Sequence, residues 1–257
     1  ITAMAKQAPV AVLIDEYDYP IVNNLHDLAV AEGNRKLLKE FFTPLKDLDK
    51  CIKLTFITGI SRFSKVSIFS GLNNLDDITM SPDYAAIGGY TEEELSKAFE
   101  EHIEAIARGR GVSEEAVFAE IKEWYNGYRF SRAATCVYNP FSTLNYMDEK
   151  EPKGYWFASG TPKFLIHEIQ KQPQITTELS GINIPETQLS DSRSPEDLNL
   201  PALMFQTGYL TIKDWEWDKI LKTTVYSLDF PNEEVHQAFF QSLLREFGKV
   251  APQEISS

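Results

Sequence analysis

The chain has 257 residues and carries 25 lysine and arginine residues against 38 aspartate and glutamate residues, so its formal net charge is −13. This charge argues against a surface built mainly to bind phosphate backbones. A composition that is 43% hydrophobic and 25% charged excludes an intrinsically disordered chain and a collagen-like chain.

The sequence contains no stretch of about 18 uninterrupted apolar residues, and its amino end lacks the layout of a secretory signal. We therefore expect a soluble, cytoplasmic protein without membrane contact. Cys51 and Cys136 are 85 positions apart and form no metal-binding pattern, so we expect two reduced thiols. The length predicts one to two domains.

The first 60 residues predict a strand, helices and a second strand. Val10 to Ile14 is an apolar run that ends at Asp15, as in a central parallel strand buried on both faces. Pro20 suits the first turn of a helix, and residues 33–50 have helical periodicity interrupted at Pro44. Residues 51–58 read as a second strand of the same sheet. This order favours a parallel sheet whose ligands lie beyond the carboxyl ends of its strands.

Residues 91–125 predict a helical hairpin. Thr91 and Glu94 form a capping box before an apolar stripe that runs through Leu95 and Ile106. The Gly-containing segment 108–111 separates this helix from a second one, which Ser113 caps.

The remainder has a mixed pattern. Residues 162–170 predict a helix, and the polar stretch 173–195 predicts a mobile loop. The last part predicts a helix, a two-stranded hairpin and a final helix, which is the outline of a winged-helix-like module. These elements are expected at residues 198–206, 209–213, 223–229 and 233–247.

The sharpest chemical signal is the pair of acids that follows the first strand. In phosphoryl transfer, an acid at this position holds Mg²⁺, often through a water, and the next acid orients or deprotonates the attacking water. Asp15 would take the first role and Glu16 the second. The alternative is that two adjacent acids solvate a loop or cap the next helix.

Polar residues also follow the second strand. Thr58 could sense a γ-phosphate, and Arg62 could stabilise transferred charge. For Arg62 the alternative is a surface ion pair on a loop. We expect Asp15, Glu16 and Thr58 to lie together at one edge of the sheet.

Two further segments carry candidate ligand residues. Residues 124–129 concentrate aromatic side chains around a turn, where Arg129 could reach a phosphate, although such a cluster is more often a packed helix end. As a sequence signal, Asn139 and Pro140 predict only a turn. The four histidines are scattered without metal spacing. Trp215 and Trp217 alternate with acids, which disfavours contact with DNA there.

Several motifs together resemble the AAA-ATPase-like family of bacterial proteins. They occur in the same order along nearly the whole chain. The motifs are VLIDEYDYP at residues 12–20, TGISRFSK at 58–65, WYNGYRF at 124–130, YNPFS at 138–142, SGTP at 159–162 and FQTGYL at 205–210.

The resemblance implies an α/β fold with a parallel-sheet P-loop NTPase core, a helical lid and a winged-helix-like segment. These parts would occupy residues 1–90, 91–160 and 161–257. The implied Walker B strand ends in Asp15 and Glu16, and the implied cofactors are ATP and Mg²⁺. A nuclease-like domain of the PD-(D/E)XK type commonly follows in this family, and it would be the part that contacts nucleic acid. Related ATPases have a Pro-containing turn at the lid, and the resemblance implies that Asn139 and Pro140 form this turn and contact the nucleotide. A homo-oligomer is compatible with the resemblance.

The chain lacks two features of the family pattern, so the resemblance does not imply every function of the family for these 257 residues. The 257 residues contain no G-x-x-x-x-G-K-[ST], and the segment after Phe247 lacks the spaced acids and lysine of a nuclease domain. Because the chain also begins with Ile1, we expect a fragment. We predict that the complete protein is a Mg-dependent ATPase that acts as a nucleotide-dependent switch, and that the isolated chain does not turn over ATP. The alternative is a non-catalytic module that docks protein or nucleic acid through its winged-helix-like segment.

Overall fold

The computed structural model describes two compact units. The described residues are 8–25, 27–60, 68–69, 74–158, 165, 169, 181–189 and 199–247. Contacts within the chain group residues 1–77 and 187–207 into the first unit, and residues 78–186 and 208–257 into the second unit.

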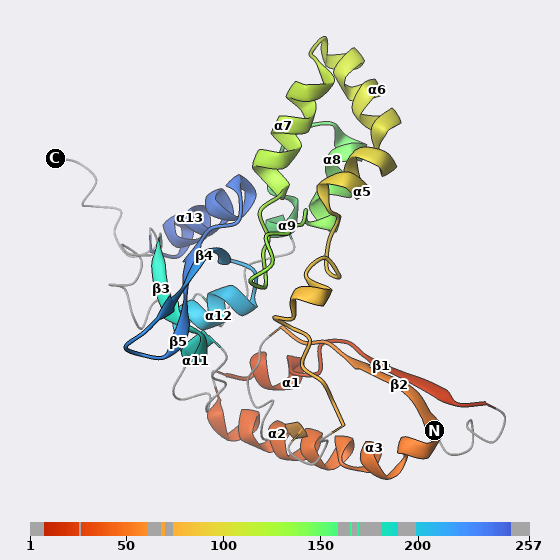
Figure 1. Ribbon diagram of the computed structural model, residues 1–257, viewed down its shortest axis with the longest axis vertical. Helices are drawn as coiled ribbons and strands as arrows, with labels where there is room; N and C mark the ends of the chain where they lie inside the picture. Colours follow the sequence, from red (N-terminus) through yellow and green to blue (C-terminus); the bar gives the residue numbers. More distant parts are fainter. Residues whose placement is uncertain are drawn as a thin grey trace. The chain divides into compact units, whose positions relative to one another are not determined.

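The first unit contains a parallel strand pair with helices between its strands (Figure 1). Its elements are β1 (Val10–Ile14), α1 (Tyr19–Val22), α2 (Leu28–Phe42), α3 (Pro44–Asp47), a 3₁₀ turn at Asp49–Cys51, β2 (Ile52–Ile57), most of α11 (Glu186–Leu189) and α12 (Leu200–Gln206). The predicted strand, helix, strand order is confirmed, and so are the break at Pro44 and the place of Pro20 in the first turn of α1.

Helix α2 begins earlier than its apolar periodicity predicts. The Asp27 carboxylate accepts hydrogen bonds from the backbone N–H groups of Ala29 and Val30, at 3.1 and 3.2 Å. This N-cap satisfies donors that the first turn would otherwise leave free, so the helix starts at Leu28 and continues through Gly33.

The prediction that the first strand is buried on both faces is wrong. Leu13 is 70% exposed, its partner Phe56 on β2 is 38% exposed, and Leu54, the partner of Ala11, is 52% exposed. Figure 1 shows α1, α2 and α3 on one side of the strand pair. Only that side is covered by described helices, so the side chains alternate between half-buried and exposed along β1.

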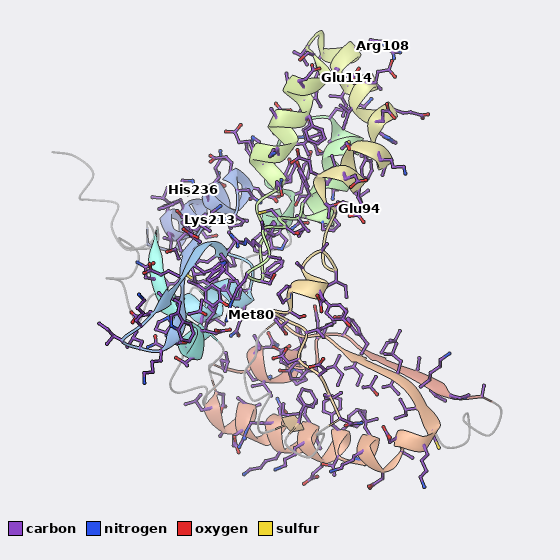
Figure 2. All side chains as sticks on the ribbon, viewed as in Figure 1. Met80, Glu94, Arg108, Glu114, Lys213 and His236 are labelled. Atoms are coloured by element: carbon purple, nitrogen blue, oxygen red, sulfur yellow. The ribbon has the colours of Figure 1, made fainter. Side chains whose placement is uncertain are left out.

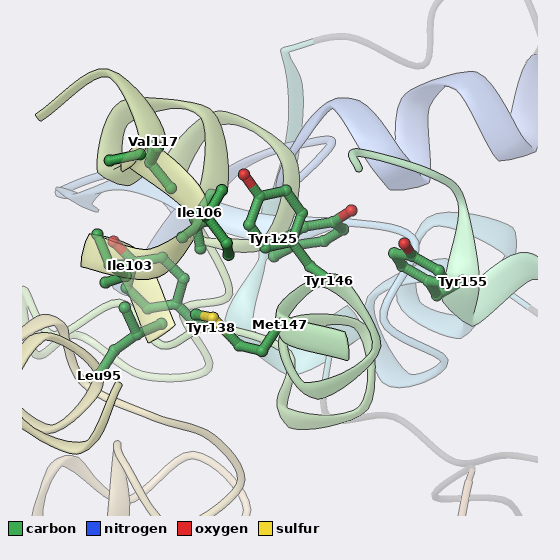
Figure 3. Packing of buried hydrophobic residues seen from close by; sticks show 11 residues of the cluster. Leu95, Ile103, Ile106, Val117, Tyr125, Tyr138, Tyr146, Met147 and Tyr155 are labelled. Atoms are coloured by element: carbon green, nitrogen blue, oxygen red, sulfur yellow. The ribbon is translucent and has the colours of Figure 1, made fainter. Parts of the chain in front are cut away.

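The second unit contains a group of helices with its own apolar core. Its helical elements are a 3₁₀ turn at Pro82–Tyr84, α5 (Glu92–Ala98), α6 (Glu100–Arg110), α7 (Glu114–Tyr125), α8 (Pro140–Glu149) and α9 (Tyr155–Ala158). Figure 3 shows buried aliphatic side chains of α5, α6 and α7 around Tyr125, Tyr138 and Tyr146. Burial of this cluster is the main stabilising contribution in the helical group.

The predicted helix boundaries at 91–125 are largely confirmed. Thr91 and Glu94 make both hydrogen bonds of a capping box, and the Ser113 hydroxyl accepts from Ala116 N at 3.2 Å. Helix α6 runs through Gly109 to Arg110, and Gly111 caps it with a left-handed φ of 68°. Arg108 and Glu114 lie beside this connection (Figure 2).

A bidentate ion pair ties α6 to α7. Arg110 donates to both carboxylate oxygens of Glu120, at 2.6 and 3.0 Å, and Tyr146 on α8 donates to the same carboxylate at 2.5 Å. The hydrogen bonds from Arg110 hold the pKa of the Glu120 carboxyl below its usual value. Charge-assisted hydrogen bonds therefore join the end of α6 to α7 and α8.

The second unit also contains an antiparallel sheet of strand order β3-β5-β4. Its strands are β3 (Ile182–Pro185), β4 (Thr211–Asp218) and β5 (Thr223–Asp229), and α13 (Glu233–Phe247) follows β5. The predicted hairpin and final helix are confirmed, but the stretch 173–195, predicted as a loop, contains β3 and α11. Strand β3 was missed because its stability comes from pairing with β5, about 40 residues away. The predicted helix at 162–170 lies largely outside the described residues.

Glu234 on α13 is fully buried. Its Oε1 accepts hydrogen bonds from Trp156 N at 2.8 Å and from the Ser142 hydroxyl at 2.9 Å, whereas Oε2 has no partner among the described residues. Burial raises the pKa of this carboxyl above its usual value. One buried acid therefore joins α8, α9 and α13.

In the part of the chain that the structure describes, none of the helices is both long enough and apolar enough to cross a membrane.

Candidate functional site

The carboxyl ends of β1 and β2 bring the predicted acid and hydroxyl into contact. Ile14 pairs with Ile57 in parallel register, so Asp15 and Thr58 follow at the same edge. The Thr58 hydroxyl donates a hydrogen bond to Asp15 Oδ1. The backbone of Thr58 donates to Ile14 O at 2.8 Å and accepts from Tyr17 N at 3.0 Å. The predicted proximity of Asp15, Glu16 and Thr58 is thus confirmed, while their roles stay predictions.

Glu16 has an unusual backbone conformation. Its φ is 52°, in the left-handed region that a non-glycine residue seldom adopts. Its N–H donates to Asp15 Oδ1 at 3.0 Å, and its carbonyl accepts from Tyr19 N at 3.0 Å. The turn leaves Asp15 and Glu16 exposed to solvent. Strained backbone that the surroundings hold in place is frequent at functional sites.

The buried Asp18 carboxylate binds the backbone that follows β2. Asp18 is fully buried, and its Oδ1 accepts a hydrogen bond from Ile60 N at 3.0 Å. Gly59 passes so close that an added Cβ would lie 2.5 Å from Tyr17 Cε1 and 2.6 Å from Asp18 Oδ1. Asp18 and Gly59 therefore set the path of the segment after Thr58. The composition around Asp18 gave no sign of this role, because adjacent acids are normally solvated.

The donor set at this edge fits Mg²⁺ only when a phosphate completes it. Asp15 Oδ2 accepts no hydrogen bond from any described residue, so one carboxylate oxygen is available at the surface. Within the described ranges, there is no group of three or more His, Cys, Asp or Glu side chains that could hold a metal by itself. Mg²⁺ is usually bound in proteins by one or two carboxylates, waters and substrate phosphates, which matches this arrangement.

The other predicted site residues have structural partners or lie elsewhere. Arg62 lies outside the described residues. Arg129 belongs to the second unit, where its guanidinium donates to the carbonyls of Ser131, Ala133, Arg132 and Lys213 at 2.6–3.2 Å. These hydrogen bonds clamp the loop after α7 onto β4, and they match the alternative interpretation of the 124–129 cluster as a packed helix end.

Asn139 and Pro140 start helix α8 in the second unit. The Asn139 side chain accepts from Ser142 N at 3.1 Å as the N-cap, and Pro140 occupies the first turn. This geometry accounts for both residue types by helix capping alone. Their contact with a nucleotide stays a prediction.

The second unit also has a cavity of about 600 Å³. It is lined by residues of α5, α7 and the loop after α7, and Lys122 pairs with Glu92 at its wall with an N–O distance of 2.7 Å. None of the predicted site residues lines it. We place the candidate site at the edge of β1 and β2 instead, because that edge joins an available carboxylate, a hydroxyl and a strained backbone.

Comparison with protein families gives a match over part of the first unit. Residues 2–69 match the family model of a predicted AAA-ATPase. This AAA-ATPase-like segment contains Asp15, Glu16, Thr58 and Arg62, so the motif resemblance and the family match agree over this part of the chain.

Similarity to a longer protein covers most of the chain. The chain is 37% identical over 238 residues to a protein of Azotobacter chroococcum mcd 1 described as an uncharacterized protein in the vnfD 5′ region. The match covers 93% of this chain but only 43% of that relative. No solved structure matches the chain.

Proposed function

We propose that the AAA-ATPase-like segment is one part of a Mg-ATP site, and that the complete protein uses ATP as a Mg-dependent conformational switch. The observation that carries this proposal is the hydrogen bond from Thr58 to Asp15 at the carboxyl ends of two parallel strands. Ligands of parallel α/β sheets bind at this end of the strands.

Each residue at the edge has a distinct proposed role. Thr58 holds the Asp15 carboxylate through Oδ1, and Asp15 would hold Mg²⁺ with its other oxygen available. Glu16, which follows directly on a tight turn, orients the attacking water and accepts its proton. Mg²⁺, when bound, neutralises phosphate charge. Arg62 is proposed to stabilise charge on the transferred phosphoryl group.

The proposal requires a phosphate cradle from outside these 257 residues. The sequence holds no G-x-x-x-x-G-K-[ST], whose backbone N–H groups and lysine bind the β- and γ-phosphates. The matched relative is more than twice as long as the matched region, which leaves room for such a segment. Coupling of the switch to a nuclease-like domain, and through it to nucleic acid, is proposed on the motif resemblance alone.

Calorimetric titration of Mg-ATP tests this proposal on two forms, the 257-residue chain and the chain extended to the full reading frame of its gene. We expect binding only by the extended form, loss of that binding in Asp15→Ala, and at least about a 100-fold lower ATPase rate in Glu16→Gln.

The control for this test is Asp47→Ala, because Asp47 is an exposed acid of the same unit that precedes β2. It should bind and hydrolyse ATP as the unchanged protein does. Failure of the extended form to bind Mg-ATP, or equal loss in Asp15→Ala and Asp47→Ala, would contradict the proposal.

A further inference from the structure

The β4–β5 hairpin presents large apolar side chains to solvent. Trp217 is 57% exposed, and Ile220 and Leu221 in the connecting turn are 91% and 58% exposed. Figure 1 shows this turn projecting away from α13. Contiguous exposed apolar residues of this kind indicate an interaction surface more often than isolated ones do.

The turn is held in one conformation. Asp218 Oδ1 accepts hydrogen bonds from Ile220 N at 2.7 Å and from Leu221 N at 2.8 Å. Lys222 completes the turn with a φ of 50°. Because these bonds fix the backbone before any partner arrives, docking on this hairpin costs little conformational entropy.

Strand β4 is also an edge of its sheet among the described strands. The start of its outer edge is occupied, since Ile212 N donates to Arg129 O at 3.2 Å and Arg129 donates to Lys213 O at 3.1 Å. Lys213 is labelled in Figure 2. Beyond it, the main chain of Asp214–Asp218 bonds to no main-chain group other than those of β5 in the described part of the chain, and Trp215 N donates to Asp214 Oδ1 at 2.8 Å. We call this segment the β4 edge.

The two faces of the β4 edge differ in chemistry. Trp215 and Trp217 pair with Tyr226 and Thr224 and share one face, and the Arg132 guanidinium lies 5.7 Å from the centre of the Trp215 ring. The alternating acids lie on the opposite face. They are Asp214, Glu216 and Asp218. Asp214 and Asp218 each use Oδ1 to accept local backbone hydrogen bonds, whereas both oxygens of Glu216 have no hydrogen-bond partner among the described residues.

This charge pattern favours some binding partners of the β4 edge over others. In an antiparallel pairing of two copies centred on Glu216, Glu216 would face its own copy and Asp214 would face Asp218, and like charges directly opposite are destabilising. A phosphate backbone would be repelled by the same acids. A strand with basic residues at alternate positions would instead place each cation opposite an acid.

We propose that the β4 edge binds an extended protein segment in which apolar and basic residues alternate. The segment adds a strand to the sheet, its apolar side chains pack on Trp215 and Trp217, and its basic side chains pair with the acids on the other face. This inference concerns the second unit and does not depend on the proposed nucleotide site.

The probe for this inference is a synthetic seven-residue peptide of alternating valine and lysine, titrated into the full chain with ¹⁵N-labelled protein. The comparison peptide has the same composition with all valines before all lysines. We expect the alternating peptide to bind at least about tenfold more tightly, with shifts concentrated in the amides and indoles of Trp215 and Trp217.

Charge reversal makes the test specific. Glu216→Lys should weaken binding of the valine–lysine peptide about tenfold and create binding of an alternating valine–glutamate peptide. Glu123→Lys, an exposed acid on α7, changes the net charge equally and should leave both affinities unchanged.

Three results would overturn the inference. They are equal affinity for the alternating and the block peptide, equal weakening by Glu216→Lys and Glu123→Lys, and peptide-induced shifts that lie outside the β4 edge. The first two would mean that general attraction to an acidic protein explains the binding, and the third would mean that the peptide binds elsewhere on the protein.

Discussion

Gly59 lies directly after Thr58 and against two buried side chains, those of Tyr17 and Asp18. The absence of a Cβ at this position lets the backbone of the strand end pass close enough for Asp18 to accept the hydrogen bond from Ile60 N. The geometry of the candidate site therefore depends on a residue that takes no part in the proposed chemistry.

Substitution of two glycines of the first unit tests this dependence. Gly59→Ala should lower the free energy of unfolding by about 1–3 kcal/mol, because its Cβ would overlap Tyr17 and Asp18. Gly33→Ala, in the interior of α2 with no atom within 4 Å of the new Cβ, should raise it by about 0.5–1 kcal/mol. Chemical denaturation of both variants checks the prediction, and equal effects of the two would refute it.

The sequence predicts a role for Glu16 but not its backbone conformation. Its position after an apolar strand predicts a role in phosphoryl transfer, whereas its left-handed backbone is visible only in the structure. The hydrogen bonds that hold this conformation involve Asp15 and Tyr19, so the strain is supported by its immediate neighbours.

At the scale of elements, the buried Glu234 holds three helices together. Its carboxylate accepts hydrogen bonds from α8 and α9 while it belongs to α13. Burial disfavours the ionised form of this carboxyl, whose Oε2 has no hydrogen-bond partner among the described residues. The folded protein therefore binds the proton of the Glu234 carboxyl more tightly than the unfolded chain does.

This raised pKa predicts a pH dependence of stability. The contribution of Glu234 is fully present below its unfolded pKa, near 4.5, and is lost as pH rises toward the higher folded pKa. Urea denaturation at a series of pH values should show a loss of stability over this range that Glu234→Gln lacks, since glutamine does not ionise. Glu123→Gln, at an exposed position on α7, should follow the unchanged protein. Parallel pH profiles for the unchanged protein and Glu234→Gln would be inconsistent with the assignment.

At the scale of the molecule, the two units differ in how completely they bury their apolar surface. The helical group encloses a cluster that includes Leu95, Ile106 and Ile121, all nearly inaccessible to solvent. The β1–β2 pair is covered by described helices on one side and exposes Leu13 and Leu54 on the other. Parallel sheets are normally covered on both faces, so the first unit has less burial per strand than is typical.

Amide hydrogen exchange should report this difference. We expect the amides of β1 and β2 to exchange at least about tenfold faster than those of α6 and α7, because local opening costs less free energy where fewer apolar contacts are lost. Exchange measured by mass spectrometry on the 257-residue chain checks this. Equal or slower exchange in the strands would contradict the prediction.

The sequence by itself determined the order of elements and many of their ends. The strand before Asp15, the strand before Thr58 and the helices capped by Thr91 and Ser113 were predictable, because caps and periodicity act over a few residues. The proximity of Asp15 and Thr58 followed from the parallel order of their strands.

Only the tertiary structure decided which faces of those elements are covered. It exposes Leu13 on a strand predicted to be buried, buries Glu234 on the final helix, pairs β3 with β5 and uses Arg129 to hold a loop on β4. Each of these features depends on residues tens of positions apart in the chain. Local patterns carry no information about such contacts, because a side chain's burial is set by what packs against it.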